Sequence, residues 1–280
     1  MKKLFRWFLT IALIFVAVIE NCAAQVEEDL LHVYFIDVGQ ADAAIITCKD
    51  MVLMIDGGNA ADSSLIYSML RNTLNIDHID YMIATHPHAD HVGGLAGVLN
   101  ACTVDVIYTP VLDYDTDAFH ALLKYAQLQG SVMTVPSTGN SFYIGDACVE
   151  ILGPSREYSD INDMSIISKI TYGGTSFLFM GDAGWDSEHD MVDAEIDLTA
   201  DVLKVGHHGS DTSTSYVFLR AVMPTYAVIS CGKGNPYGHP TEAVLSRLSD
   251  ADVIIYSTDE DGTIECVSDG NEIWFSTEND

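Results

Sequence analysis

Short apolar runs rich in branched and aromatic residues recur along the chain, separated by turns that contain glycine, asparagine or aspartate. Runs of this length and composition are typical of β-strands. Glycine-rich or histidine-rich loops follow several of them, so polar side chains gather where predicted strands end. The pattern predicts strands at 31–38, 43–48, 51–55, 81–85, 104–109, 131–135, 141–152, 165–172, 175–180, 201–205, 226–231, 253–257, 262–267 and 272–275.

A second pattern, with apolar residues three and four positions apart, predicts amphipathic helices between these runs. It is clearest at 61–75, and at 117–129 after it. Further helices are expected at 92–100, after 184, at 215–222 and from 238 to 248. Strands and helices fill two comparable halves with no linker between them. We therefore predict one domain over residues 25–280, an α/β sandwich of two mixed sheets with helices on the outer faces.

The first 24 residues follow a different pattern, in which Lys2, Lys3 and Arg6 precede an apolar run at 7–19 and small residues follow at 22–24. This layout is typical of a secretory signal peptide. We expect a secreted or extracytoplasmic protein whose N-terminal segment contacts the membrane transiently. An uncleaved anchor is the alternative, although the run is short for a membrane span. Lipid attachment at Cys22 ranks third, because residues 19–21 lack the small side chains of such sites.

The composition is strongly acidic: 12 basic residues stand against 41 acidic ones, a formal net charge of −29. Loss of residues 1–24 would remove three basic residues and Glu20, and would move the charge to −31. A field of this sign repels polyanions at long range and attracts cations. The basic residues nearest to the motifs described below are Lys204, Arg220, Lys233 and Arg247.

The cysteines beyond residue 24 are widely spaced, odd in number and without a C-x-x-C pair: Cys48, Cys102, Cys148, Cys231 and Cys266. We expect small core residues and no disulfide framework.

The densest set of metal-binding groups lies directly after the predicted strand at 81–85. His86 and His88 are two positions apart, so in an extended segment their imidazoles point to the same side and can bind one cation. Asp90 and His91 are adjacent and can face a second cation on the turn that follows. So many ligand types in six positions at a strand end favour a metal site over isolated structural histidines.

Three further positions place polar groups at strand ends. Asp182 follows an apolar strand within a glycine-rich turn, where the alternative role is a helix N-cap. His207 and His208 end another strand, and we assign His207 to the second cation and His208 to the substrate. His239, at a strand-to-helix junction, is a further catalytic candidate. The sequence leaves open which of these three histidines is a ligand and which donates a proton.

The H-x-H-x-D-H run at 86–91 resembles the signature of the metallo-β-lactamase fold superfamily. The resemblance implies an αββα sandwich, one or two divalent metals between its sheets, and mostly hydrolytic chemistry. It also implies that Asp182 bridges the two metals and that Asp56 orients the histidine loop through hydrogen bonds, as outer carboxylates do.

One element of that family pattern is missing. Many members have a third histidine before the Gly-Asp turn, but here His120 lies within a helical pattern. Asn162 and Asp163, just before a predicted strand, are the substitutes that the sequence offers. An oxygen ligand in place of nitrogen shifts the preference from zinc toward manganese, so we expect two divalent ions, Zn or Mn.

Longer segments narrow the resemblance. Residues 33–43, 162–165, 202–210 and 235–240 are similar to the soluble C-terminal domain of ComEC competence proteins, over essentially 31–275. The membrane channel of that family is absent from this sequence, so DNA transport is not implied. What the resemblance implies is phosphodiester hydrolysis, with water activated by the cations and with Asp90 or a histidine protonating the leaving oxygen. Single-stranded DNA is the first candidate substrate, and no stable protein partner is implied.

The acidic composition supports a rival substrate. A cell-wall phosphocholine esterase of the same fold would suit acidic walls, with Trp185, Tyr216 or Tyr237 in an aromatic cage for choline. Ordinary packing is the simpler interpretation of those aromatic residues. A β-lactamase is disfavoured by the missing histidine, and a non-catalytic metal-binding module by the full ligand set.

Overall fold

Two β-sheets pack face to face in the computed structural model, which describes residues 30–279. The signal peptide predicted at 1–24 lies outside these residues. The first sheet has eight strands in the order β15-β14-β1-β2-β3-β4-β5-β6. They are β1 Leu31–Phe35, β2 Ala43–Cys48, β3 Met51–Gly57, β4 His78–Ile83, β5 Thr103–Tyr108, β6 Val132–Thr134, β14 Ile264–Ser268 and β15 Ile273–Thr277.

The second sheet has seven strands in the order β13-β12-β11-β10-β9-β8-β7. They are β7 Ser141–Ile144, β8 Ala147–Gly153, β9 Ile167–Tyr172, β10 Thr175–Phe179, β11 Val202–Lys204, β12 Tyr226–Ile229 and β13 Ile254–Ser257. Both sheets are mixed: β3 to β6 run parallel, as do β10 to β13, and the remaining pairs are antiparallel.

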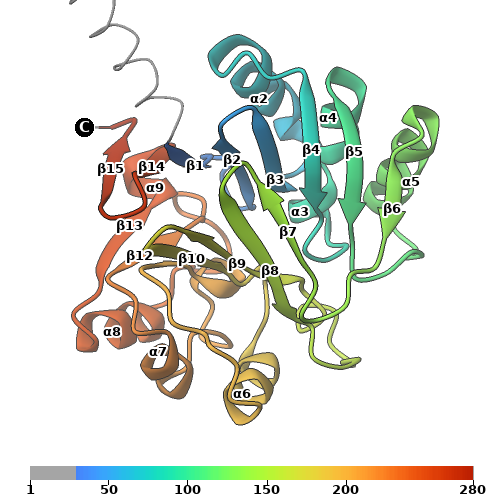
Figure 1. The fold of residues 1–280 in the computed structure, drawn as a ribbon. Helices are drawn as coiled ribbons and strands as arrows, with labels where there is room; N and C mark the ends of the chain where they lie inside the picture. The colour runs from blue at the N-terminus through green and yellow to red at the C-terminus, as the bar shows by residue number, and fades with distance from the viewer. Residues whose placement is uncertain (1–29, 280) are drawn as a thin grey trace, which may run out of the picture.

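Helices cover the outer face of each sheet (Figure 1). Outside the first sheet lie α2 Ser63–Ser68, α4 Leu95–Ala101 and α5 Asp117–Gln129. Outside the second lie α6 Trp185–Asp193, α7 Tyr216–Val222 and α8 Glu242–Asp250. Short helical segments complete the set: η1 Ala60–Asp62, η2 Met69–Thr73, α3 Ala89–Val92, η3 Gly206–Gly209 and α9 Thr258–Asp261. The predicted α/β sandwich of two mixed sheets is confirmed.

The strand sequences show why the layers form. β1 buries only alternate residues, and its buried face joins the core between the sheets. β3 is buried almost throughout: Leu53 and Ile55 face the other sheet, while Val52 and Met54 face the helices. A strand covered on both faces reads as a continuous apolar run, whereas a strand covered on one face alternates.

Several element boundaries differ from the sequence prediction. The strand expected at 141–152 is a hairpin, because Gly145 turns the chain at a φ of 55°. The helix expected at 61–75 consists of three short segments, and α9 was not predicted.

The helix expected at 92–100 is interrupted at Gly93 and Gly94. A Cβ on Gly94 would lie 1.9 Å from the carbonyl oxygen of Gly57. The chain therefore passes β3 at a distance that only glycine allows.

All five cysteines in the described range are free, and four of them are core residues as predicted, whereas Cys148 is half-buried. Within residues 30–279, none of the helices has both the length and the apolar character that crossing a membrane requires.

Candidate metal centre

The predicted metal-binding residues converge where strands of both sheets end. The loop after β4 carries His86, His88, Asp90 and His91, and the turn after β10 carries Asp182. β11 leads into His207 and His208, which form η3 with their flanking glycines. The seam is closed by the Ile166 amide, which donates to the Thr85 carbonyl oxygen at 2.8 Å. Segments from positions 86 to 208 thus meet at one seam between the sheets.

Asp182 lies at the middle of this cluster, and its two oxygens face different histidines. Oδ2 is 3.7 Å from Nε2 of both His86 and His207. Oδ1 is 3.3 Å from His91 Nε2 and 3.7 Å from His208 Nε2. The carboxylate is buried, at 3% exposure. One side chain therefore separates two sets of ligand atoms.

The ligand atoms include two neighbouring groups. In the first, atoms of His86, His88 and Asp182 all lie within 4.8 Å of one another; in the second, atoms of Asp90, His91 and His208 do. Contacts of 3.3–3.7 Å between these atoms are too long for hydrogen bonds. Ligands bound at about 2.0–2.2 Å around a tetrahedral ion are separated by roughly 3.3–3.6 Å.

Unpartnered buried atoms support the same interpretation. Within the described part of the chain, His91 Nε2, His208 Nε2 and Asp182 Oδ1 are buried without a hydrogen-bond partner. An unpaired buried polar atom is costly, and a bound ion is one accepted explanation. The three atoms face one another, so the donor set fits a divalent cation.

Asp56 holds the histidine loop from behind. Its Oδ1 accepts from the Thr85 amide at 2.8 Å, and its Oδ2 accepts from the Thr85 hydroxyl at 2.7 Å. Oδ2 also lies 2.8 Å from His91 Nδ1. A hydrogen on Nδ1 leaves Nε2 of His91 with a lone pair that faces Asp182. This position agrees with the orienting role that the resemblance implied.

Asp42, immediately before β2, supports His208 in a similar way, a role that was not predicted for it. His208 Nδ1 lies 3.0 Å from the Ser230 carbonyl oxygen and 3.2 Å from Asp42 Oδ1. Lys204 Nζ donates to Asp42 Oδ2 at 2.8 Å, and both side chains are buried. The only sequence signal for Asp42 was its place in the segment 33–43.

The positions of His207 and His208 differ from those expected. His208, not His207, lies with Asp90 and His91, since its Nε2 is 3.4 Å from Asp90 Oδ2. His208 is 2% exposed, which leaves little room for the substrate contact assigned to it. The His207 side chain is 26% exposed and faces the other oxygen of Asp182. The side chains of neighbours diverge here because both backbones are left-handed.

Left-handed backbone conformations cluster at this centre. His207 has φ 49° and ψ 45°, His208 has φ 53° and ψ 24°, and Asp56 has φ 57°. Such conformations cost non-glycine residues about 1–3 kcal/mol each, and they persist where the surrounding structure holds them. Strain at three residues of one cluster is typical of a functional site.

Charges set the protonation of the centre. Burial alone would raise the pKa of Asp182, but the neighbouring histidines His91, His208 and His86 outweigh it and hold that pKa well below its ordinary value. Burial would lower the pKa of His91, but Asp182 and Asp56 raise it well above normal, so a cation that binds at Nε2 would displace a proton. Asp182 is therefore ionised at neutral pH.

Segment 162–165, the substitute expected for the missing histidine, lies beside Asp182 and His86. Ser165 Oγ accepts from the Asp182 amide at 3.0 Å and lies 3.4 Å from His86 Nδ1. Asn162 Oδ1 is buried and unpartnered among the described residues. Asp163 accepts from the Gly184 amide at 2.8 Å, so it caps α6, which is the role considered for Asp182. His120 is an exposed residue of α5 and takes no part.

A cleft of about 400 Å³ opens beside the centre. None of the described residues that line it is a lysine or arginine. Its walls are Asp160, Asn162, Asp163, Asp182, Gly184, Trp185, Asp186, His207, Asp211 and Thr212. His239 lies behind the wall residue His207, and their ring centroids are 5.8 Å apart. Among the described residues, Nδ1 of His239 is buried and has no hydrogen-bond partner.

Two of the four basic residues singled out in the sequence lie in structural contacts. Lys204 is paired with Asp42 beneath the centre. Arg247 donates to the Ser213 carbonyl oxygen at 2.8 Å and is 9% exposed. Arg220 and Lys233 are exposed. The centre therefore has less basic surface than the sequence positions suggested.

Comparisons with known proteins agree with this geometry. The chain is 28% identical over 252 residues to ComE operon protein 3 of Bacillus subtilis, covering 84% of this chain and 32% of that protein. It is 31% identical over 233 residues to competence protein ComA of Neisseria gonorrhoeae, covering 82% and 31%. The chain thus spans about a third of the length of these curated relatives.

Solved structures show the same fold. The metallo-beta-lactamase fold protein YhfI of Bacillus subtilis matches with a TM-score of 0.55 at 13% identity, over 89% of this chain and all of that one. CmlA, a diiron beta-hydroxylase from Streptomyces venezuelae, matches with a TM-score of 0.53 at 15% identity, over 80% and 52%. Residues 36–233 match the family described as the metallo-beta-lactamase superfamily, and the chain belongs to that superfamily.

Proposed function

We propose that the protein is a metal-dependent phosphodiesterase that works with two divalent cations. The observation that carries the proposal is the position of Asp182, whose two oxygens face separate groups of ligand atoms. His86, His88 and Asp182 would hold one cation, with Asn162 available as an oxygen donor. Asp90, His91, His208 and Asp182 would hold the other. Imidazole and carboxylate donors suit zinc and manganese.

The chemistry that such cations supply is activation of water and neutralisation of charge on a phosphoryl oxygen. The chain's own residues orient the reaction. Asp56 and Asp42 hold His91 and His208 with Nε2 toward the centre. His207 lines the cleft and can hydrogen-bond to the substrate, and His239, whose ring lies against that of His207, or Asp90 can protonate the leaving oxygen.

DNA, in single-stranded form, is the first candidate substrate, because the curated relatives include a competence protein. We propose that it is met outside the cytoplasm, in keeping with the signal peptide predicted at 1–24, and that only this segment contacts the membrane. The exposed Arg220 and Lys233 are available for phosphate contacts, although the acidic net charge opposes DNA binding at long range.

A small phosphodiester with a cationic group, such as phosphocholine, is the second candidate, and the cleft favours it. Trp185 is 44% exposed at the cleft wall, with Asp160, Asp186 and Asp211 around it. An aromatic face beside carboxylates is suited to a quaternary ammonium group. Of the three candidate aromatic residues, Trp185 is the one that lines the cleft. The Arg247 guanidinium already lies 5.5 Å from its ring centroid, so a choline group would have to share or displace that contact.

Hydrolysis of bis(p-nitrophenyl) phosphate with added Mn²⁺ or Zn²⁺ tests the reaction. We expect turnover by the parent protein and none by Asp182→Ala or His86→Ala. Equal turnover by parent and variants would refute the enzymatic proposal. Tight metal binding without hydrolysis of any phosphodiester would favour the metal-binding module instead.

A direct comparison of single-stranded DNA with phosphocholine-bearing wall fragments separates the two substrates. Trp185→Ala should weaken activity on the choline substrate and spare bis(p-nitrophenyl) phosphate. Trp274→Ala is the matched control, because Trp274 is equally exposed at 44% but lies on β15. Cleavage of DNA alone, unaffected by Trp185→Ala, would exclude the choline candidate.

A further inference from the structure

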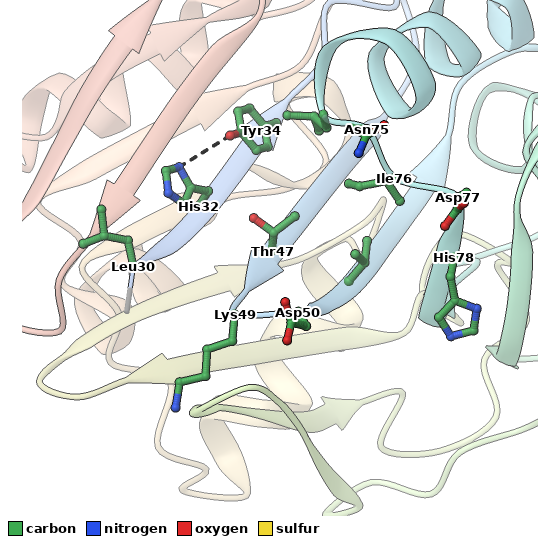
Figure 2. Close-up of a pocket in the computed structure, with 12 residues that line it drawn as sticks. Leu30, His32, Tyr34, Thr47, Lys49, Asp50, Asn75, Ile76, Asp77 and His78 are labelled. Atoms are coloured by element: carbon green, nitrogen blue, oxygen red, sulfur yellow. Dashed lines mark hydrogen bonds between the residues drawn. The ribbon is translucent and has the colours of Figure 1, made fainter. Parts of the chain in front are cut away.

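A second cluster of metal-binding side chains lies at the opposite end of β4 from the histidine loop. His78 and Asp80 are on β4, and Asp105 is on the adjacent parallel strand β5. Figure 2 shows His78 at the start of β4, where it lines a pocket together with Asp77 and Asp50. None of these residues belongs to the centre described above, so the cluster is independent of the proposed hydrolase function.

The cluster has the dimensions of a cation site. His78 Nε2 lies 3.5 Å from Asp105 Oδ2 and 3.8 Å from Asp80 Oδ1. The three ligand atoms all lie within 4.8 Å of one another. The spacing exceeds a hydrogen bond and resembles that at the main centre. The three atoms are therefore close enough for small side-chain movements to bring them around one cation.

Two of the three ligands are held by their other polar atom. His78 Nδ1 lies 2.8 Å from Thr103 Oγ1, which places its hydrogen on that side and leaves the Nε2 lone pair toward the carboxylates. Asp80 Oδ2 accepts from the Val52 amide at 2.8 Å, which leaves Oδ1 for the cluster. Partners that fix a ligand's tautomer and orientation are typical of metal sites.

The strand register places two carboxylates of the cluster next to each other, so a positive charge between them is favourable. Ile79 pairs with Val104 and Tyr81 with Val106, so Asp80 and Asp105 lie side by side on neighbouring strands. Like charges at such positions are destabilising, and the chain already has a net charge of −29. A neutral His78 does not relieve this repulsion, whereas a divalent cation does.

We propose that His78, Asp80 and Asp105 bind a divalent transition metal, zinc or manganese, which joins the start of β4 to β5. One imidazole and two carboxylates match the donors of zinc sites, and the partial exposure of all three leaves room for water ligands. The other end of β4 leads into His86. The cation therefore stabilises the strand that delivers the histidine loop to the main centre.

Metal stoichiometry tests the proposal on the full chain. Equilibrium dialysis against Zn²⁺ with elemental analysis should show that His78→Ala with Asp105→Asn binds one equivalent fewer than the parent. The same variant should lose part of the rise in melting temperature that Zn²⁺ produces. Its rate on bis(p-nitrophenyl) phosphate should stay unchanged, which separates this site from the main centre.

His120→Ala is the matched control, because His120 Nε2 is 3.9 Å from Asp115 Oδ1 on an exposed surface but has no second carboxylate in its group. It should bind as much zinc as the parent. The replaced side chains are 43% and 66% exposed and the variant lacks the Asp80–Asp105 repulsion, so in EDTA the double variant should melt at or above the temperature of the parent. Full stoichiometry in the double variant, or equal loss in the control, would overturn the proposal.

Discussion

Replacement of Asp56 by asparagine should move the hydrogen of His91 from Nδ1 to Nε2 without removing any of the proposed metal ligands. Asparagine has the same shape, and it tolerates the left-handed backbone at this position, where φ is 57°. Its oxygen can still accept from the Thr85 amide. Its NH₂ group would then face His91 Nδ1, which lies 2.8 Å from Oδ2 of the aspartate. His91 Nδ1 would have to accept, so the hydrogen would move to Nε2 and occupy the lone pair aimed at the centre.

The magnitude follows from the contacts that change. Loss of a partner that orients a metal-binding histidine typically costs 10–100-fold in metal affinity, which is about 1.4–2.7 kcal/mol. The fold should suffer less, because a neutral amide is easier to bury than the carboxylate and keeps the contact to Thr85. We expect the free energy of unfolding without metal to fall by less than about 2 kcal/mol.

Chelator competition for Zn²⁺ measures the affinity, and initial rates with bis(p-nitrophenyl) phosphate measure activity at saturating metal. Asp201→Asn is the matched control: Asp201 also accepts from a backbone amide and a hydroxyl, both of Ser176, at 2.8 and 3.1 Å, but it contacts no histidine. Affinity for zinc should stay at the parent value in the control. A folded Asp56→Asn protein with parental zinc affinity would refute the tautomer argument.

Three further changes test the support of the centre. Lys204→Met should destabilise the protein by about 3–5 kcal/mol in urea unfolding, since it leaves the buried Asp42 carboxylate with His208 as its remaining close cationic partner, and adding Asp42→Asn should recover part of the loss. Gly94→Ala should cost about 3 kcal/mol or more, because the new methyl would meet the Gly57 carbonyl oxygen; Gly174→Ala, whose nearest contact is 3.3 Å, should be mild by the same measurement. Burial raises the pKa of the Glu188 carboxyl, so its charged form is disfavoured in the fold. The parent should therefore lose stability relative to Glu188→Gln as the pH rises from below the ordinary glutamate pKa to above the raised one. Thermal melts at several pH values measure this, and a difference in melting temperature that stays constant with pH would contradict it.

Much of the prediction of the fold and of the centre rested on short motifs. The histidine loop follows one apolar strand and Asp182 follows another, so both were recognisable as polar groups at strand ends. Their meeting at one centre was what the family resemblance implied. Short apolar runs likewise located β1 and β3 in the chain. These signals depend on residues that are neighbours in the chain.

Other features depended on contacts that the sequence does not encode locally. Asp42 and Lys204 are far apart in the chain, and only the packing of the two sheets pairs them. The directions of His207 and His208 follow from left-handed backbones that are held in part by Gly209, where a Cβ would lie 2.7 Å from Pro240 Cβ.

The sequence by itself determined the two-sheet architecture and the residue types of the centre, because periodicity and strand-end chemistry are properties of short segments. Only the tertiary structure decided which adjacent histidine joins Asp90 and His91, which carboxylates orient the imidazoles, and which basic residues are buried. Those outcomes depend on backbone conformation and on the approach of distant segments, and both are set by packing across the seam between the sheets.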